Sequence, residues 1–458
     1  MQERTGTPAP RPALSWSDLR GSRAGVWGLG VEGRANLRKL TELGADPVLV
    51  DDRPPAGAEA GGEGLAGRPV LATGEGGLAA LAACDVVVKS PGISRYRPEV
   101  RELSARGVPV TGGLALWLAG ADRARVVCVT GTKGKSSTTA IAGHLLRGLG
   151  YQCLTGGNIG QPPWDPARPD AAAGCDFWVI ETSSYQATDL AFSPPVVAVT
   201  SLHPDHLDWH GDVATYYRDK LSACSQPGAD LTVANGDSDL LAERAALLGP
   251  RVEWVRADDE PGADWMARLG LLGTHNRRNA LIARACLRAL GVPAAADNAA
   301  LAAAAAGFTP LASRLTVIGE VAGVTFVDDS LSTNVLPTLA ALDAFPGRRV
   351  ALIAGGHDRG IDYRPLAAGL AARDAPTLVL AIPDSGPRIA AAIEAGSPGK
   401  AEVSVCPDLA AAVGRGLRWA RPDGVVLLSP AAPSFGVFRD YRDRGQAFAA
   451  AMQACAPA

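Results

Sequence analysis

The stretch Val127–Ala140, "VCVTGTKGKSSTTA", is a β-branched run that meets two glycines, two lysines and a string of serines and threonines. A strand that enters a helix through such a turn presents backbone N–H groups to phosphate oxygens. We expect Lys135 to reach the β- and γ-phosphates of a nucleotide and Ser136 to ligate Mg²⁺. The expected nucleotide contacts are Gly131, Thr132, Lys133, Gly134, Lys135, Ser136 and Ser137. Val129 stands where the Walker A pattern has glycine, so the loop is a shortened variant; the alternative is a glycine-rich turn with incidental lysines.

Length and composition limit the class of protein. The 458 residues are enough for about three domains, and the net charge of −3 gives no basic field for a nucleic-acid backbone. No apolar run reaches the roughly 20 residues of a membrane-spanning helix. The polar, proline-rich N-terminus is interpreted as a flexible leader over residues 1–20 rather than a signal peptide. The eight cysteines are scattered without CxxC spacing, which favours reduced thiols and a cytoplasmic location.

Short apolar runs alternate with helical stretches in three blocks along the chain. Each run ends in small or polar residues, as in "DFWVIETSSY" and "GVVLLSPAAPS". This alternation predicts an α/β fold with parallel sheets covered on both faces. We expect three domains, at residues 21–120, 121–312 and 313–458.

Two further segments carry groups that suit a nucleotide-bound metal. Glu181 ends the predicted strand in "WVIETSSYQ", and the next strand leads into "SLHPDHLDWH", which contains His203, His206 and His210. Alone, the histidine segment could be a metal site or a polar loop; beside Glu181 it favours His206 as a ligand. Lys220 follows this segment, and the whole chain has only six lysines. It is a candidate functional residue; the alternative is a surface lysine on a helix.

Taken together, these motifs resemble the Mur ligase superfamily over nearly the whole chain. The resemblance rests on the "GTKGKS" loop, "ETSSYQ", "HPDHLD", "GTHNRRNA", "SRL" and "LSPAAPSF", which occur in the family's order. "GLGVEG", "GGNIG" and "DDSLSTN" are most similar to the branch of the family that adds glutamate to UDP-N-acetylmuramoyl-L-alanine.

The resemblance implies an ATP-dependent acid–amino-acid ligase of peptidoglycan precursor synthesis. The γ-phosphate would pass to a carboxylate, and the amine of the amino acid would attack the acyl phosphate. Lys135, His206 and Lys220 would be catalytic, and two Mg²⁺ ions would be held by Ser136, Glu181, His206 and Lys220. Lys220 matches a lysine that is carbamylated in many family members, which arginine could not replace.

The resemblance also assigns binding residues and domain roles. The three domains would be a Rossmann-like UDP-binding domain, a central P-loop ATPase domain and a Rossmann-like domain for the amino acid. The expected nucleotide residues outside the loop are Asn276, Asn279, Arg314 and Asp329. The expected substrate residues are Gly30, Asp51, Arg53, Ser90, Asn158, Thr333, Arg359, Ser434 and Tyr441.

Several departures from the family pattern cluster around the amino acid acceptor. Leu331 replaces a lysine of the usual "DSKATN", Arg359 replaces a second lysine, and "SPAAPSFG" replaces "SPACASFD". Ser313 also stands in place of a histidine. These changes favour L-glutamate over D-glutamate, with an epimerase acting later; the alternative is drift around an unchanged D-glutamate pocket.

Other classes of protein remain open at this stage. Gly28, Gly30 and Gly33 form a GxGxxG that would ordinarily suggest a NAD-dependent dehydrogenase. A non-catalytic nucleotide-binding module and a Mur ligase for a different amino acid are further alternatives. We expect a monomer, with no nucleic-acid partner and no membrane insertion.

Overall fold

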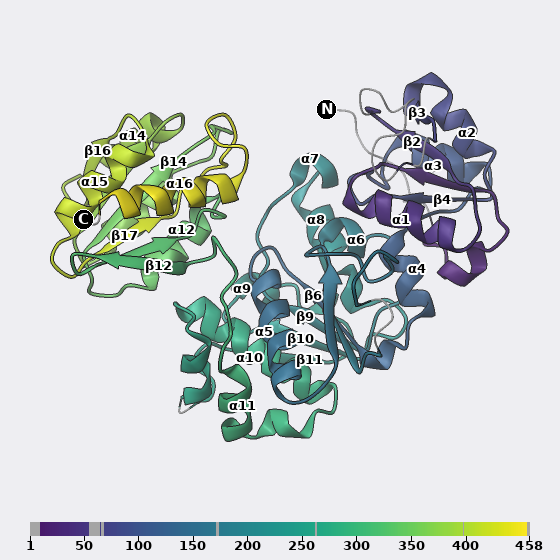
Figure 1. Cartoon of the computed structure of the whole chain (residues 1–458), viewed down its shortest axis with the longest axis horizontal. Coiled ribbons are helices and arrows are strands. Elements are labelled where there is room, and N and C mark those ends of the chain that lie inside the picture. Colours follow the sequence, from purple (N-terminus) through teal and green to yellow (C-terminus); the bar gives the residue numbers. More distant parts are fainter. Residues whose placement is uncertain are drawn as a thin grey trace. The chain divides into compact units, whose positions relative to one another are not determined.

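A computed structural model describes residues 10–54, 65, 68–170, 174–261, 263–396 and 398–455. The chain contains three separate sheets, each with its own helices (Figure 1). Part of the expected leader, residues 1–9, lies outside the described residues.

The first sheet has five parallel strands in the order β3-β2-β1-β4-β5. The central strands β1 and β4 are fully buried, as expected for strands covered on both faces, whereas the edge strand β3 is half buried. The strands are β1 Ala24–Trp27, β2 Val48–Asp51, β3 Val70–Ala72, β4 Val86–Lys89 and β5 Val110–Gly112. The helices are α1 Val31–Glu42, α2 Leu78–Ala82, α3 Pro98–Ala105 and α4 Gly113–Gly120.

The second sheet has six parallel strands in the order β11-β10-β9-β6-β8-β7. The strands are β6 Val126–Thr130, β7 Cys153–Gly157, β8 Phe177–Glu181, β9 Val196–Val199, β10 Leu231–Asn235 and β11 Val252–Val255. The helices are α5 Lys135–Gly148, α6 Ser184–Ala187, α7 Leu207–His210, α8 Val213–Leu221, α9 Asp239–Ala242, α10 Thr274–Ala289 and α11 Asn298–Ala305. Since β8 and β9 flank β6, the segments that follow all three strands meet at one edge of the sheet.

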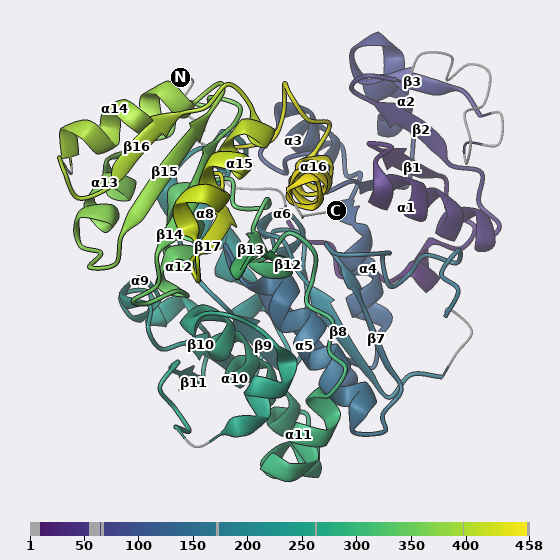
Figure 2. The ribbon, with the colours of Figure 1, turned by 60° about the vertical axis from the view of Figure 1, so that its left-hand side comes forward.

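The third sheet has the order β12-β13-β17-β14-β15-β16, and only its β12–β13 pair is antiparallel. The strands are β12 Thr316–Val321, β13 Val324–Asp328, β14 Val350–Gly355, β15 Thr377–Ile382, β16 Glu402–Val405 and β17 Val425–Leu428. The helices are α12 Val335–Asp343, α13 Arg364–Ala371, α14 Gly386–Gly396, α15 Leu409–Ala420 and α16 Tyr441–Ala454. Alternate residues of β14 enter two apolar cores, one under α12–α14 and one under α15 and α16. Figure 2 shows the ribbon of this sheet with its helices. The predicted α/β class is confirmed.

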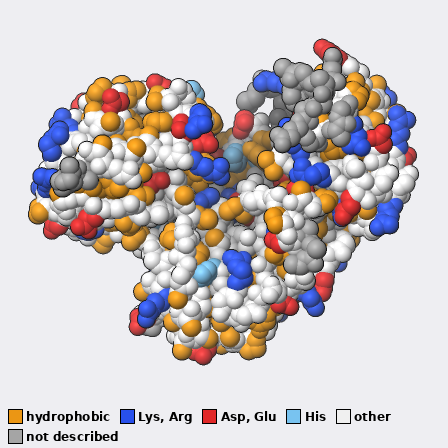
Figure 3. Space-filling model, in the orientation of Figure 1, with side chains coloured by type: hydrophobic (Ala, Val, Ile, Leu, Met, Phe, Trp, Pro, Cys, Tyr) orange, Lys and Arg blue, Asp and Glu red, His pale blue; other side chains and the backbone are white. Residues whose placement is uncertain are grey.

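The chain divides into two compact units. The first comprises residues 1–265 and 278–306 and holds the first two sheets; the second comprises residues 266–277 and 307–458 and holds the third. Helix α10 crosses the division between them. Among the described residues, no helix combines the length and the apolar character needed to cross a bilayer. Basic and acidic side chains are interspersed over the face drawn in Figure 3.

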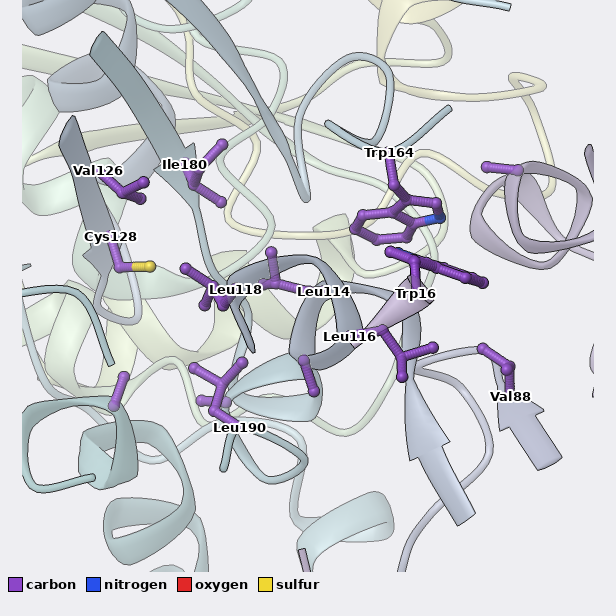
Figure 4. Packing of buried hydrophobic residues seen from close by; sticks show 14 of the residues in the cluster. Trp16, Val88, Leu114, Leu116, Leu118, Val126, Cys128, Trp164, Ile180 and Leu190 are labelled. Carbon is purple, nitrogen blue, oxygen red and sulfur yellow. The ribbon is translucent and has the colours of Figure 1, made fainter. Parts of the chain in front are cut away.

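The segment expected to be a leader contributes to the core of the first unit. Trp16–Leu19 forms a 3₁₀ turn, and the side chains of Trp16 and Leu19 are buried. The ring of Trp16 lies 6.2 Å from that of Trp164, next to the apolar face of α4 (Figure 4). Burial of large aromatic rings stabilises a chain segment strongly, so ordered structure begins before residue 20.

Within the first unit, polar side chains join the N-terminal sheet to the central one. Lys89 Nζ lies 2.5 Å from Asp189 Oδ2 in a fully buried ion pair. Arg38 donates two hydrogen bonds to Asp165, at 2.8 and 2.6 Å. Separating Lys89 from Asp189 would leave two buried charges uncompensated, which is costly. The ion pair therefore holds the two sheets together.

Glu32 gives this junction a pH dependence. Its carboxyl accepts a hydrogen bond from Gln186 of α6, and burial raises its pKa to about 8. Because the folded-state pKa exceeds that of the unfolded chain, Glu32 favours the fold at low pH and that contribution is lost as the pH rises through about 8. At pH 9, Glu32→Gln should be more stable than the wild type by at least about 1 kcal/mol.

Urea unfolding at pH 5 and pH 9 tests this expectation. The difference between Glu32→Gln and the wild type should be much smaller at pH 5, close to the ordinary pKa of a glutamate, than at pH 9. Glu42→Gln, at the exposed end of the same helix, is the matched control and should show no such pH dependence. A difference of equal size at both pH values would contradict the raised pKa.

Candidate active site

The glycine turn after β6 is built as a phosphate loop. Gly131 and Gly134 have φ values of 133° and 89°, which favour glycine. A Cβ at Gly131 would lie 2.3 Å from Thr200 Oγ1, and one at Gly134 would lie 2.8 Å from Asn279 Oδ1. Lys133 N donates a hydrogen bond to Ser201 Oγ at 2.8 Å, so the segment that follows β9 holds the loop in place. Ser136, at the start of α5, is buried.

Two lysines converge on a single carbonyl of this loop. Lys135 Nζ donates to Gly131 O at 2.9 Å, and Lys220 Nζ from α8 donates to the same oxygen at 3.1 Å. Burial, followed by the nearby ammonium of Lys135, holds the pKa of Lys220 well below its usual value. Lys135 therefore brings an ammonium group to this oxygen, and a positive charge at the turn attracts an anion.

Glu181 offers a free oxygen beside the loop. The side chain is buried at the end of β8, and its Oε1 accepts a hydrogen bond from Asn158 Nδ2 at 2.7 Å. Its Oε2 is buried and has no hydrogen-bond partner among the described residues. Buried carboxylate oxygens are normally satisfied, and an unpaired one fits a hard cation such as Mg²⁺.

The structure separates the roles of the histidines. His206 is half exposed in the left-handed region, with φ 51°, and burial together with the charges of Lys220, Lys133 and Lys135 lowers its pKa. A neutral imidazole is the form that ligates metals. His210 instead is fully buried, 2.6 Å from Asp219 Oδ2.

Among the described residues, no three His, Cys, Asp or Glu side chains form a cluster that could hold a metal ion. The expected set contributes only Glu181 and His206 of these types. A metal here would need Ser136, a modified Lys220, phosphate oxygens or water to complete its coordination, which is how Mg²⁺ is usually held at phosphates.

The glycine turn after β1 is held by its own neighbours. The carboxylate of Asp51 accepts hydrogen bonds from Leu29 N at 2.7 Å and Arg53 N at 2.9 Å, so it fixes the backbone of the turn. Ser90 Oγ donates to Gly28 O at 2.6 Å and is buried. Gly30 caps α1 and has open space around it, and the Arg53 side chain is exposed. Gly30 and Arg53 therefore remain accessible to a ligand, whereas Asp51 and Ser90 also carry structural hydrogen bonds.

Asn276 and Asn279 lie three residues apart on α10, so they share one face of that helix. Both are buried. Asn276 Nδ2 donates to Leu272 O at 2.9 Å, and Asn279 lies against Gly134 of the phosphate loop.

In the second unit, Asp329 organises the loop that carries Arg314. Its carboxylate accepts hydrogen bonds from Leu315 N at 3.1 Å and Ser429 Oγ at 2.7 Å. Burial raises the pKa of Asp329 to about 7. Ser313 and Leu315 have φ values of 59° and 53°, so the loop around Arg314 is held in an unusual backbone conformation. Ser313, in place of the family histidine, donates to Asp328 Oδ2 at 2.8 Å.

The residues expected at the amino acid site lie on loops of the second unit. The exposed guanidinium of Arg359 lies 5.8 Å from the ring of Phe435, next to buried Ser434. Tyr441 is the first residue of α16, and Thr333 precedes the cap of α12. Arg359 and Ser434 thus lie in neighbouring loops, and their role in binding the amino acid stays a prediction.

Arg444 was missed by the sequence interpretation. Its guanidinium is fully buried and donates to the carbonyls of Ser330 at 2.8 Å and Ala432 at 3.0 Å, with longer bonds to Gly355 and Pro433. It therefore ties together the three loops that hold the altered motifs. The segment "YRDRGQ" contains three consecutive charged residues, Arg442, Asp443 and Arg444. Nothing in this segment distinguishes Arg444 as the buried one.

A phosphate loop at the centre of a parallel sheet, with Glu181 and Lys220 beside it, defines an ATP-using α/β protein. Residues 22–112 match the Mur ligase MurD-like N-terminal domain, residues 129–267 the Mur ligase middle domain, and residues 313–432 the Mur ligase glutamate ligase domain. The chain belongs to the Mur ligase family, and it is an ATP-dependent amino acid ligase.

Relatives similar to this chain cover almost all of it. One is the UDP-N-acetylmuramoyl-L-alanine--L-glutamate ligase of Micromonospora sp., 46% identical over 95% of this chain and 98% of the relative. The enzyme of the same name from Salinispora tropica is 44% identical over the same shares. The MurF ligase of Thermotoga maritima, solved in complex with ADP, is 15% identical, with a TM-score of 0.54 and 99% of each chain covered, and shows a shared fold.

Proposed function

We propose that this chain joins L-glutamate to UDP-N-acetylmuramoyl-L-alanine at the expense of ATP, in peptidoglycan precursor synthesis. The observation that carries this proposal is the convergence of Lys135 and Lys220 on Gly131 O beside the unpaired oxygen of Glu181. The names of the relatives at 46% and 44% identity support the same substrates.

The phosphate loop would bind the nucleotide through the backbone of Gly131–Ser137, with Lys135 at the β- and γ-phosphates. Ser136, Glu181, His206 and Lys220 would hold two Mg²⁺ ions. When bound, Mg²⁺ offsets the charge of two anionic reactants brought together. Lys220 would act as a carbamate: burial lowers the pKa of its amine, which favours the neutral form that adds to carbon dioxide.

The first unit would bind the UDP-linked substrate. Gly30, Asp51, Arg53 and Ser90 would bind its nucleotide portion, and Asn158 would contact the sugar while fixing Glu181 by its 2.7 Å hydrogen bond. The carboxylate of the substrate would receive the γ-phosphoryl group, and the resulting acyl phosphate would be attacked by the amine of glutamate. Asn276, Asn279, Arg314 and Asp329 would also bind the nucleotide.

Thr333, Arg359, Ser434 and Tyr441 would bind the incoming glutamate. Arg359 presents an exposed guanidinium, and guanidinium binds carboxylate in a bidentate geometry that lysine cannot match. Leu331 stands where the usual family motif has a lysine, so this site lacks a second positive charge. A pocket with one planar cation is consistent with a change in the stereochemistry of the acceptor, and an epimerase would then act on the product. We further propose a cytoplasmic monomer.

Phosphate release from ATP and Mg²⁺ in the presence of UDP-N-acetylmuramoyl-L-alanine tests the proposal, with L- and D-glutamate compared side by side. Turnover with L-glutamate alone is expected. Turnover with D-glutamate alone would contradict the assignment of stereochemistry but keep the ligase reaction. No turnover with either would overturn the choice of acceptor.

A further inference from the structure

Three buried polar side chains of the first unit, His210, Asp219 and Ser184, form one hydrogen-bonded network with the half-buried Tyr96. His210 Nδ1 donates to Asp219 Oδ2 at 2.6 Å, and His210 Nε2 shares a hydrogen bond with Ser184 Oγ at 2.9 Å. Tyr96 Oη donates to Asp219 Oδ1 at 2.6 Å. Each of the three central residues is at most 6% exposed.

His210, Asp219 and Ser184 each lie within four residues, along the chain, of a residue of the proposed metal site. Asp219 precedes Lys220 on α8, and His210 follows His206 by four residues through α7. Ser184 begins α6, three residues after Glu181. One network therefore ties together the backbone segments that carry Glu181, His206 and Lys220.

Tyr96 comes from a different sheet. It lies in the loop after β4, six residues beyond Ser90, where the N-terminal part would bind its substrate. A second contact follows the same route, since Trp209 Nε1 donates to Gly92 O at 3.2 Å and its ring lies 6.1 Å from that of Tyr96.

The network also reaches the phosphate loop. The ring of His210 lies 5.1 Å from that of Tyr216, whose hydroxyl is 2.9 Å from Thr132 Oγ1. On the other side, Tyr185 lies between the rings of Trp209, at 4.6 Å, and His206, at 5.2 Å. Tightly packed polar networks have few alternative arrangements, so a shift at one end is passed to the other.

We propose that Tyr96, Asp219, His210 and Ser184 are positioning residues that couple occupancy of the substrate loop at Ser90–Tyr96 to the geometry of the phosphate and metal side chains. Binding of the UDP-linked substrate then tightens the nucleotide site, and the nucleotide tightens the substrate site by the same factor. The inference rests on the proposed function, which supplies the two ligands.

A mere structural role is the competing explanation, because buried ion pairs and hydrogen bonds also hold folds together. Buried polar pairs contribute little net stability compared with apolar residues of the same shape. They do specify one arrangement of the segments that they join, which is what a reaction between two bound anions requires. Stability and coupling can be measured separately.

The test uses Tyr96→Phe, which removes only the hydroxyl that joins the two sheets and keeps the ring. Binding of adenylyl imidodiphosphate with Mg²⁺ is measured by calorimetry with and without UDP-N-acetylmuramoyl-L-alanine. We expect the UDP-linked substrate to tighten nucleotide binding by at least about 5-fold in the wild type, and by less than about 2-fold in Tyr96→Phe. Asp219→Asn should lose the coupling in the same way.

Steady-state kinetics supply a second readout. In Tyr96→Phe, kcat should fall by about 5-fold or more while KM for glutamate stays within about 2-fold, because the acceptor binds elsewhere. Tyr217→Phe is the matched control: it lies on the same helix as Asp219, and its hydroxyl bonds to none of the described residues. It should leave both the coupling and kcat unchanged.

The outcomes separate the two proposals. A wild-type enzyme that turns over but shows no coupling, or a Tyr96→Phe variant with wild-type coupling and kcat, overturns the positioning network alone. A fall in melting temperature without loss of coupling also overturns it, since that is the result of a purely structural role. Absence of turnover in the wild type overturns the proposed function instead.

Discussion

Lys135→Ala should lower kcat by roughly 10²–10³-fold or more, the usual cost of removing one preorganised group that stabilises developing charge. Lys135 Nζ lies 2.9 Å from Gly131 O in a loop whose backbone N–H groups already favour anions. Its ammonium would neutralise charge at the β- and γ-phosphates, and neither water nor Lys220 can take its place in that position. Phosphate release under saturating substrates measures the loss.

Lys400→Ala is the matched control, because Lys400 is exposed in the second unit and should tolerate the change. The melting temperature of Lys135→Ala should stay close to that of the wild type, since an exposed or half-exposed lysine contributes little to stability. Activity within a few-fold of the wild type would refute the assignment of the phosphate loop.

Lys220→Ala should lower kcat by at least about 100-fold, because we propose Lys220 as a metal ligand and loss of a ligand costs no less than loss of its supporting partners. Burial holds the pKa of Lys220 well below its usual value, and the neutral amine is the form that becomes a carbamate. The alanine variant leaves room where the side chain lay, so a small carboxylate such as formate or acetate should restore part of the activity. The same concentration of chloride should not.

Lys220→Arg separates the two possible roles of this residue. Arginine keeps a positive charge near Gly131 O but cannot form a carbamate, so it should be as inactive as the alanine variant. An active arginine variant would show that Lys220 acts as a cation. Failure of every carboxylate to restore Lys220→Ala would leave carbamylation without support.

Local chemistry was readable from the sequence where a function requires particular residues at a fixed spacing. The phosphate loop needs glycine at φ values that other residues rarely adopt, and Gly131 and Gly134 have φ values of 133° and 89°. Glu181 was placed at a strand end because short apolar runs predict buried parallel strands, and β8 ends at Glu181 beside β6.

Spatial partnerships across distant segments were not readable. His210 shares one histidine-rich segment with His206, but it is a buried partner of Asp219 and Ser184. Arg444 lies in a charged run that resembles a solvent-exposed helix, yet it is fully buried under three loops. Trp16 packs against Trp164 in a segment that composition alone suggested was a flexible leader.

The amino-acid sequence by itself determined the α/β class, the glycine turn between β6 and α5, and the carboxylate of Glu181 at the end of β8. These features depend on local patterns, because backbone conformation and strand burial follow from neighbouring residues. Only the tertiary structure decided that Lys135 and Lys220 share one carbonyl, that Tyr96 meets Asp219, and that Arg444 ties three loops together. Such contacts depend on how sheets and helices pack, and packing is set by the whole chain rather than by any one motif.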